Sequence, residues 1–180
     1  MKKRWQQELY SLLKCFVFAF IIVVICRNFL FSPSVVHGES MSPTFEDGNK
    51  VILSKISDIE HFDMIVFHAP DQDANYIKRV IGLPGDTVSM KDDVLYINGK
   101  AYTEFYLKEN KLGATTAKLT GDFTLEEETG EKTVPNNSLF VLGDNRLKSK
   151  DSRDFGFISD KSVIGKVVLR IYPLNEIGLP

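Results

Sequence analysis

The chain has 180 residues, of which 43% are hydrophobic and 26% are charged, a balance typical of a folded protein. Residues 38–180 carry 17 Lys and Arg against 23 Asp and Glu, a net charge of −6, which argues against a nucleic-acid partner. Both cysteines, Cys15 and Cys26, lie in one apolar run, and the three histidines lack metal-ligand spacing. We therefore expect no metal and no other cofactor.

The first predicted element is a transmembrane helix from Leu12 to Phe31. Twenty residues as a helix span about 30 Å, the thickness of a bilayer's hydrocarbon core. Phe, Ile and Val occupy every face of this helix, so a buried helix of a soluble domain fits poorly. Four basic residues precede the unbroken apolar centre and should remain on the cytoplasmic side: Lys2, Lys3, Arg4 and Lys14.

These features predict a single-pass protein of the cell membrane with three parts. They are a cytoplasmic tail (1–11), a transmembrane anchor (12–31) and an extracytoplasmic β-domain (32–180). A cleavable secretory signal stays open as an alternative, because Val36 and Gly38 are small enough for positions −3 and −1 of a cleavage site.

Beyond residue 38 the sequence alternates short β-prone runs with turns. The Asn98-Gly99 pair predicts a type I′ hairpin, because both residues tolerate positive φ. We expect a mainly β, antiparallel, partly barrel-like domain with no long amphipathic helix. A polar stretch at 107–134 reads as an insertion on this core. The predicted strands are Val51–Leu53, Met64–His68, Tyr76–Ile81, Thr87–Met90, Val94–Ile97, Ser138–Leu142 and Val163–Tyr172.

Three segments after the anchor could carry chemistry, and each alone has an ordinary structural reading. Ser40-Met41-Ser42-Pro43-Thr44 could be a simple turn. The run Lys78 to Asp86, KRVIGLPGD, places a lysine on the same strand face as Tyr76, where burial could keep its amine neutral. The run Gly143 to Arg153, GDNRLKSKDSR, could be an exposed loop with weak ion pairs.

Together, and in this order behind an anchor, these segments resemble the type I signal peptidases in the short form of Gram-positive bacteria. Members are membrane-bound serine–lysine proteases that remove signal peptides from secreted preproteins. The resemblance covers essentially the whole chain. It implies substrates with small residues at −1 and −3, delivered by the secretion translocase, and an enzyme that works at the lipid bilayer.

The resemblance also assigns roles residue by residue. Ser40 would be the nucleophile and Lys78 the general base. Tyr76 and Phe67 would exclude water from the lysine, and Ser149 would form a hydrogen bond with its amine. The backbone N–H groups of Ser40 and Gly38 would hold the oxyanion, because position 38 lacks the serine of some relatives. Met41 would help to line the substrate pockets. Two ion pairs would brace the site without taking part in the chemistry: Asp144 with Arg79, and Asp151 with Arg153.

Two other functions remain as alternatives. Self-cleaving repressor-type proteases share the fold and the serine–lysine pair, but they are soluble and carry a DNA-binding module. An inactive membrane-anchored binding module is the second alternative, against which the intact Ser40 and Lys78 argue.

Overall fold

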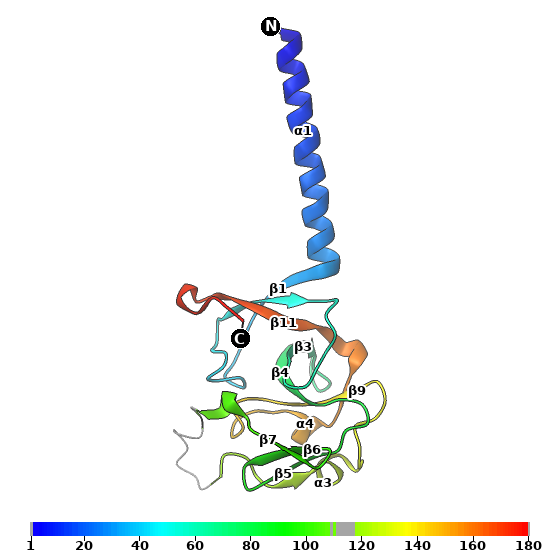
Figure 1. The fold of residues 1–180 in the computed structure, drawn as a ribbon, viewed down its shortest axis with the longest axis vertical. Coiled ribbons are helices and arrows are strands. Elements are labelled where there is room, and N and C mark those ends of the chain that lie inside the picture. Colours follow the sequence, from blue (N-terminus) through cyan, green and yellow to red (C-terminus); the bar gives the residue numbers. More distant parts are fainter. Residues whose placement is uncertain (1, 109, 111–117, 180) are drawn as a thin grey trace.

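A computed structural model describes residues 2–108, 110 and 118–179. Figure 1 shows one long helix, α1 (Lys2–Ile25), projecting from a compact β-domain. The 18 residues Glu8–Ile25 are long and apolar enough to cross a membrane, and none of them is buried in the protein. A secretory signal would meet the same description. A π-helical turn, η1 (Cys26–Leu30), leads directly from α1 into the first strand.

The β-domain contains two antiparallel sheets. The larger sheet has the strand order β1-β2-β11-β3-β4-β9-β10. Its strands are β1 (Phe31–Val35), β2 (Lys50–Ser54), β3 (Met64–His68), β4 (Asn75–Gly82), β9 (Ser138–Leu142), β10 (Ile158–Ser159) and β11 (Val163–Tyr172).

The smaller sheet has the order β7-β6-β5-β8 and lies at the end of the domain farthest from α1 (Figure 1). Its strands are β5 (Val88–Lys91), β6 (Val94–Ile97), β7 (Lys100–Tyr102) and β8 (Phe123–Thr124). The β6–β7 hairpin confirms the predicted type I′ turn, with φ of 53° at Asn98 and 74° at Gly99.

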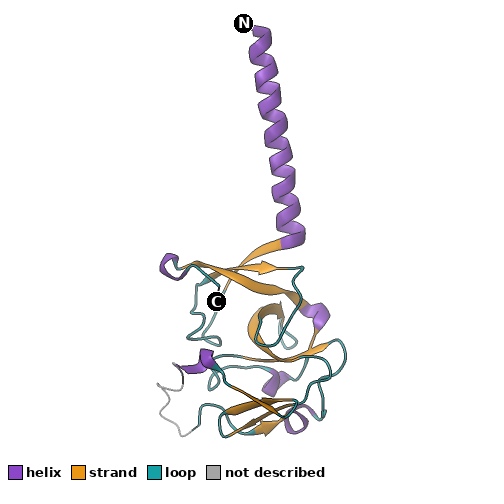
Figure 2. Cartoon of the chain, in the orientation of Figure 1, coloured by secondary structure: helices purple, strands orange, loops and turns teal. Residues whose placement is uncertain are grey.

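The helices of the domain are all short, as Figure 2 shows in purple. They are η2 (Phe105–Leu107), α3 (Leu125–Thr129), α4 (Ser152–Phe155), η3 (Asp160–Ser162) and η4 (Leu174–Glu176). Within the described residues no amphipathic helix of ordinary length occurs outside α1. The fold is therefore mainly β and antiparallel, as predicted. Strands β1 and β10 form the open ends of the larger sheet, so barrel-like closure stays a prediction.

The structure differs from the sequence prediction at β1, which was not expected to be a strand. The helical backbone stops at Leu30, and Phe31 already pairs with Ser54 of β2. The segment contains Pro33, which has no backbone N–H to donate and is therefore disfavoured in a strand that is paired on both sides. It forms a strand here because β1 is an edge strand and pairs with β2 alone.

Three apolar clusters form the core. One fills the space between the two sheets, where Ile81, Phe140 and Leu142 of the larger sheet pack against Leu95, Ile97 and Phe123 of the smaller. Two others cover opposite faces of the larger sheet around β3 and β4: Met41, Phe45, Met64, Val66 and Ile77 on one face, and Ile65, Phe67, Val80 and Val141 on the other. Strand β4 lies between them and carries the lysine considered next.

Candidate active site

Ser40 lies in a turn between β1 and β2 that is held down by its apolar neighbours. Met41 and Phe45 are fully buried in the core, and the Phe45 N–H donates to the Met41 carbonyl at 2.9 Å. Ser40 itself is only half-buried. The turn therefore anchors its apolar side chains and leaves the serine near the surface.

This packing corrects the expectation for Met41. Its side chain has no exposed surface and belongs to the core, and it is not among the residues that line the groove beside Ser40. Apolar side chains of neighbouring strands line the groove instead: Val36, Val51, Val66 and Ile77. A methionine at this position is drawn inward because burying its thioether chain is favourable.

Lys78 lies in the middle of β4 and is almost completely buried, with 3% of its surface exposed. It shares a strand face with Tyr76 and Val80, and its Nζ lies 5.3 Å from the centroid of the Tyr76 ring. Phe67, on β3 opposite Tyr76, meets that ring edge-on with centroids 6.2 Å apart. Tyr76 thus lies beside the lysine amine, and Phe67 packs against Tyr76.

Burial lowers the pKa of Lys78 from 10.5 to about 8, and the negative charges of Asp151 and Asp144 limit the decrease. A lysine with such a pKa is substantially neutral at mildly alkaline pH. It can therefore accept a proton, which an exposed lysine cannot do there.

Ser40 and Lys78 line the same groove, which has a volume of about 960 Å³. The segment before Ser40 forms one side of it, including His37, Gly38 and Glu39. The start of β4 and the loop before it form another side, and Lys148 and Lys150 complete the rim. The groove thus brings the predicted nucleophile and base to one open cavity.

Two buried ion pairs hold the loop that follows β9, as expected. Arg79 donates to both carboxylate oxygens of Asp144, at 2.9 and 2.6 Å, and Asp144 also accepts from Thr44 Oγ1 at 2.5 Å. Arg153 donates to both oxygens of Asp151, each at 2.9 Å. Asp151 also accepts from the Gly143 N–H at 3.0 Å, so the second pair closes the loop onto its own start.

Gly143 is the point at which Ser40 and Ser149 meet. A Cβ at this position would lie 2.1 Å from Ser149 Oγ and 2.5 Å from the Ser40 carbonyl oxygen, distances that no real contact tolerates. The absence of a side chain therefore lets the two serine segments pack on either side of the same backbone.

The expected hydrogen bond between Ser149 and the lysine amine is not formed. Ser149 Oγ is buried and has no hydrogen-bond partner among the described residues. The hydroxyl lies against the Gly143 backbone, 2.1 Å from where a Cβ of that residue would be, and in this position it meets no partner in hydrogen-bond geometry. An unsatisfied buried hydroxyl is costly and is common where a structure serves chemistry rather than stability.

The expectation that the Gly38 N–H is an oxyanion donor is also corrected. This N–H donates to Asp47 Oδ1 at 2.8 Å, so the donor is already occupied. By contrast, no described residue accepts a hydrogen bond from the Ser40 N–H, so this donor is available.

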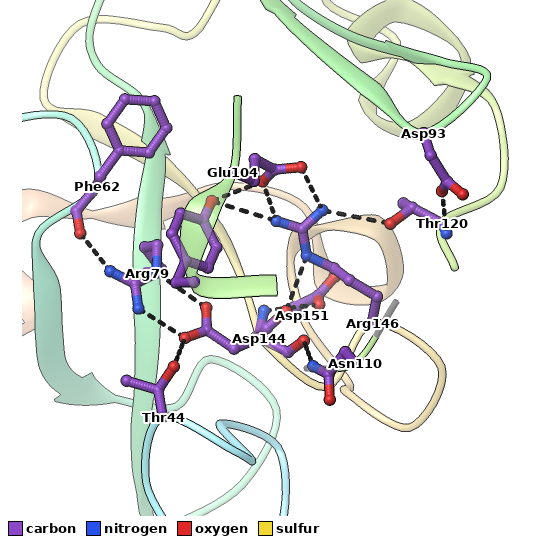
Figure 3. A network of polar contacts seen from close by, with 12 residues as sticks. Thr44, Phe62, Arg79, Asp93, Glu104, Asn110, Thr120, Asp144, Arg146 and Asp151 are labelled. Atoms are coloured by element: carbon purple, nitrogen blue, oxygen red, sulfur yellow. Dashed lines mark hydrogen bonds and ion pairs between the residues drawn. The ribbon is translucent and has the colours of Figure 1, made fainter. Parts of the chain in front are cut away.

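The sequence analysis missed a buried polar network behind the loop (Figure 3). Arg146 forms an ion pair with Glu104, donates from Nε to the Gly143 carbonyl at 3.0 Å and reaches Thr120 Oγ1 at 3.3 Å. Tyr106 donates to Glu104 at 2.5 Å and stacks on the Arg79 guanidinium, with 3.9 Å to the ring centroid. Only the position of Arg146 in the GDNR run could have pointed to this network.

Asp86 of the KRVIGLPGD run and His61 are not among the residues that line the groove. Asp86 accepts from the Leu83 N–H at 2.7 Å and contacts His61 Nε2 at 2.6 Å, which braces the loop after β4. His37 lines the groove but is largely exposed and lies 3.8 Å from Asp47. Among the described residues no cluster of His, Cys, Asp and Glu could hold a metal.

Comparisons with known proteins show which family the chain resembles. The family model described as "Signal peptidase, peptidase S26" matches residues 9–172. Signal peptidase I of Bacillus caldolyticus is 50% identical over 162 residues, which cover 88% of each chain. Signal peptidase I of Bacillus licheniformis is 41% identical over 179 residues, 96% of this chain and 93% of that protein. The crystal structure of a signal peptidase I from Enterococcus faecalis is 47% identical, with a TM-score of 0.60, and the match covers 62% of this chain and 98% of that one.

Proposed function

Because this chain belongs to the signal peptidase family, peptidase S26, we propose that Ser40 and Lys78 form its catalytic dyad. The membership confirms the family predicted from the motifs and makes the protein a serine protease that removes signal peptides from preproteins. The dyad is supported chiefly by one observation. Lys78 is buried, has a pKa lowered to about 8 and lines the same groove as Ser40.

In the proposed reaction, neutral Lys78 accepts the proton of Ser40 Oγ as that oxygen bonds to the scissile carbonyl carbon. The resulting ammonium gives the proton to the leaving amine while the C–N bond breaks, which leaves an acyl group on Ser40. Lys78 then accepts a proton from water as the water oxygen bonds to the acyl carbon. The ammonium returns this proton to Ser40 Oγ as the ester C–O bond breaks, which releases the signal peptide and restores the neutral lysine. The Ser40 N–H is the available donor to the oxyanion; the Gly38 N–H would first have to leave Asp47.

Ser149 and the two ion pairs are proposed to support this dyad. Rotation of the unpartnered Ser149 hydroxyl toward the groove would offer it to the Lys78 amine once a substrate is bound. The pairs Arg79–Asp144 and Arg153–Asp151 hold the loop that carries it. The apolar walls of the groove suit small side chains at −1 and −3 of the substrate.

The cellular setting follows as part of the same proposal. The exposed apolar helix fits a membrane-anchored enzyme, and the basic tail before it supports a cytoplasmic N-terminus. We propose a single-pass protein of the cell membrane that acts at the bilayer on preproteins leaving the secretion translocase. Parts 1–11, 12–31 and 32–180 remain the proposed domain division, although Phe31 already belongs to β1. The stretch 107–134, of which residues 109 and 111–117 lie outside the described part, contributes Phe123, Leu125 and Val134 to the core between the sheets.

The test is cleavage of a signal-bearing precursor by the full chain in detergent, with the new N-terminus determined. Ser40→Ala and Lys78→Ala should each abolish cleavage, and the double variant should lose little more, because the two residues act as a unit. His61→Ala and His68→Ala are controls and should cleave normally. Substantial activity in either dyad variant would refute the assignment, and loss of activity in His37→Ala alone would reassign the base.

A further inference from the structure

We infer that Asn145 is a positioning residue that fixes the direction of the Ser40 N–H and the placement of Ser40 against Ser149. The inference rests on the proposed roles of these two serines. It concerns an uncharged residue that is not among those lining the groove, and it is argued from four hydrogen bonds.

Two of these bonds hold the segment of the nucleophile. Asn145 Nδ2 donates to the Glu39 carbonyl at 3.0 Å, and the Asn145 backbone N–H donates to the Ser40 carbonyl at 3.0 Å. These carbonyls belong to the peptide groups on either side of the Ser40 Cα. One residue thus fixes both peptide planes next to the nucleophile.

The first bond matters most because of peptide geometry. The Glu39 carbonyl and the Ser40 N–H belong to the same planar trans peptide and point in opposite directions. An amide that holds the carbonyl therefore also sets where the N–H points. This N–H is the available oxyanion donor, and such donors act only when aimed in advance at the position of the developing charge.

The other two bonds tie Asn145 to the second serine. The Asn145 carbonyl accepts from the Ser149 N–H at 2.8 Å and from the Lys148 N–H at 3.0 Å. Asn145 is thereby bonded directly to Ser40 on one side and to Ser149 on the other. These two bonds, and the bond to the Ser40 carbonyl, come from the Asn145 backbone, so a change in its side chain removes only the bond to the Glu39 carbonyl and tests its effect on the Ser40 N–H.

The neighbours of Asn145 are fixed elsewhere, so the residue starts from a rigid position. Asp144 is paired with Arg79 on β4, and Arg146 with Glu104, both in buried surroundings. Other contacts near Asn145 involve different atoms: Thr44 and Asn110 both donate to Asp144. Lys148 pairs with the Glu39 side chain, but at an exposed site where ion pairs contribute little.

The experiment compares Asn145→Ala and Asn145→Asp with the unaltered full chain in detergent, using precursor cleavage per folded molecule. Alanine removes the donor, and aspartate keeps the shape but turns an acceptor toward the Glu39 carbonyl. We expect kcat to fall 10- to 100-fold in both, with KM within about twofold, because the loss concerns the transition state. The acidic limb of the pH profile should not move, since Lys78 is untouched.

Asn98→Ala is the matched control. Asn98 also joins two segments through its amide, donating to Asp86 and accepting from the Thr87 N–H, but it lies in the β6–β7 turn outside the groove. It should lower the melting temperature and leave kcat unchanged. A kcat of Asn145→Ala within twofold of the unaltered chain, or a loss carried by KM, would overturn the inference. If Asn145→Ala does not fold, Asn145→Asp decides by the same criteria.

Ser40→Ala in the same assay separates the two proposals. If Ser40→Ala cleaves the precursor, the proposed dyad is wrong. If Ser40→Ala is inactive and Asn145→Ala is fully active, only the role of Asn145 is overturned.

Discussion

Gly143 is the residue at which the site has least room, because Ser149 Oγ and the Ser40 carbonyl both lie against it. We expect Gly143→Ala to lower kcat by about 100-fold, since the added methyl must push the two serine segments apart and small misplacements of reacting groups are costly. Overpacking should also destabilise the fold by about 1–3 kcal/mol. Precursor cleavage and thermal unfolding measure the two effects.

Gly121→Ala is the control for this change. Nothing lies within 4 Å of a Cβ at Gly121, so neither activity nor melting temperature should change. Equal behaviour of the two alanine variants would contradict the close packing at Gly143.

Lys78 predicts how activity depends on pH. Its pKa of about 8 means that about one molecule in ten carries the neutral amine at pH 7 and about nine in ten at pH 9. Because the neutral form is the base, kcat/KM should rise as pH increases through about 8 and level off above it. Initial rates at low substrate concentration from pH 6 to 10 measure this limb.

Two substitutions sharpen that test. Lys78→Arg should be inactive, because a guanidinium does not deprotonate in this range. Phe67→Ala should admit water beside Tyr76, raise the pKa of Lys78 and move the acidic limb to higher pH. A working Lys78→Arg enzyme would show that the lysine supplies only charge.

At this scale the sequence allowed prediction of residues in ordered motifs and of two ion pairs among them, but not of their other contacts. Ser40 and Lys78 stand in short runs whose order is specific. Glu104 and Asn145 could not be assigned, because the partners of Glu104 and Asn145 lie 42 and 106 residues away along the chain and are brought near only by folding. The hydrogen bond from the Gly38 N–H to Asp47 could not be predicted either, because the turn between β1 and β2 brings the two residues together.

Among the elements, the loop from β9 to α4 is joined to β4 by a buried ion pair between Asp144 and Arg79. Asp144→Ala would leave the Arg79 guanidinium buried without its partner, which costs about 3–5 kcal/mol. For a chain of this size that corresponds to a fall in melting temperature on the order of 10 °C. Thermal unfolding followed by circular dichroism measures it.

Glu126→Ala is the matched control, because the Glu126 side chain pairs with Lys132 at an exposed site. Exposed pairs contribute about 1 kcal/mol or less, so the melting temperature should hardly change. A similar decrease in both variants would argue against a stabilising role of the buried pair.

The strands were more predictable than the loops that connect them. Short runs of apolar residues predicted β3, β6, β9 and β11 with the bounds observed, because the side chains of these strands pack into the core. Strands β8 and β10 have two residues each and carry no periodic signal. They form because β5 and β9 offer free edges, which is a property of the assembled sheet.

For the whole molecule, the way the helix joins the sheet bears on whether the anchor is retained. Strand β1 pairs along its whole length with β2, and Val36 is buried in the core. Cleavage after Gly38 would remove both from the domain, along with the bond from the Lys55 N–H to the Leu30 carbonyl at 2.9 Å. We therefore expect mass spectrometry of the membrane-purified protein to give the full-length chain. A chain beginning at Glu39 would instead support the cleavable signal.

The last prediction concerns orientation. The basic residues before the apolar run should stay in the cytoplasm, because positive charges resist transfer across the membrane. The helix then passes through the bilayer and leads directly into β1, which places the groove with Ser40 and Lys78 on the outer side. Protease added to intact spheroplasts should digest residues 32–180 and spare an epitope tag fused before Met1. In lysed spheroplasts the tag should be digested as well. Protection of the β-domain in intact spheroplasts, with the tag digested, would reverse the orientation.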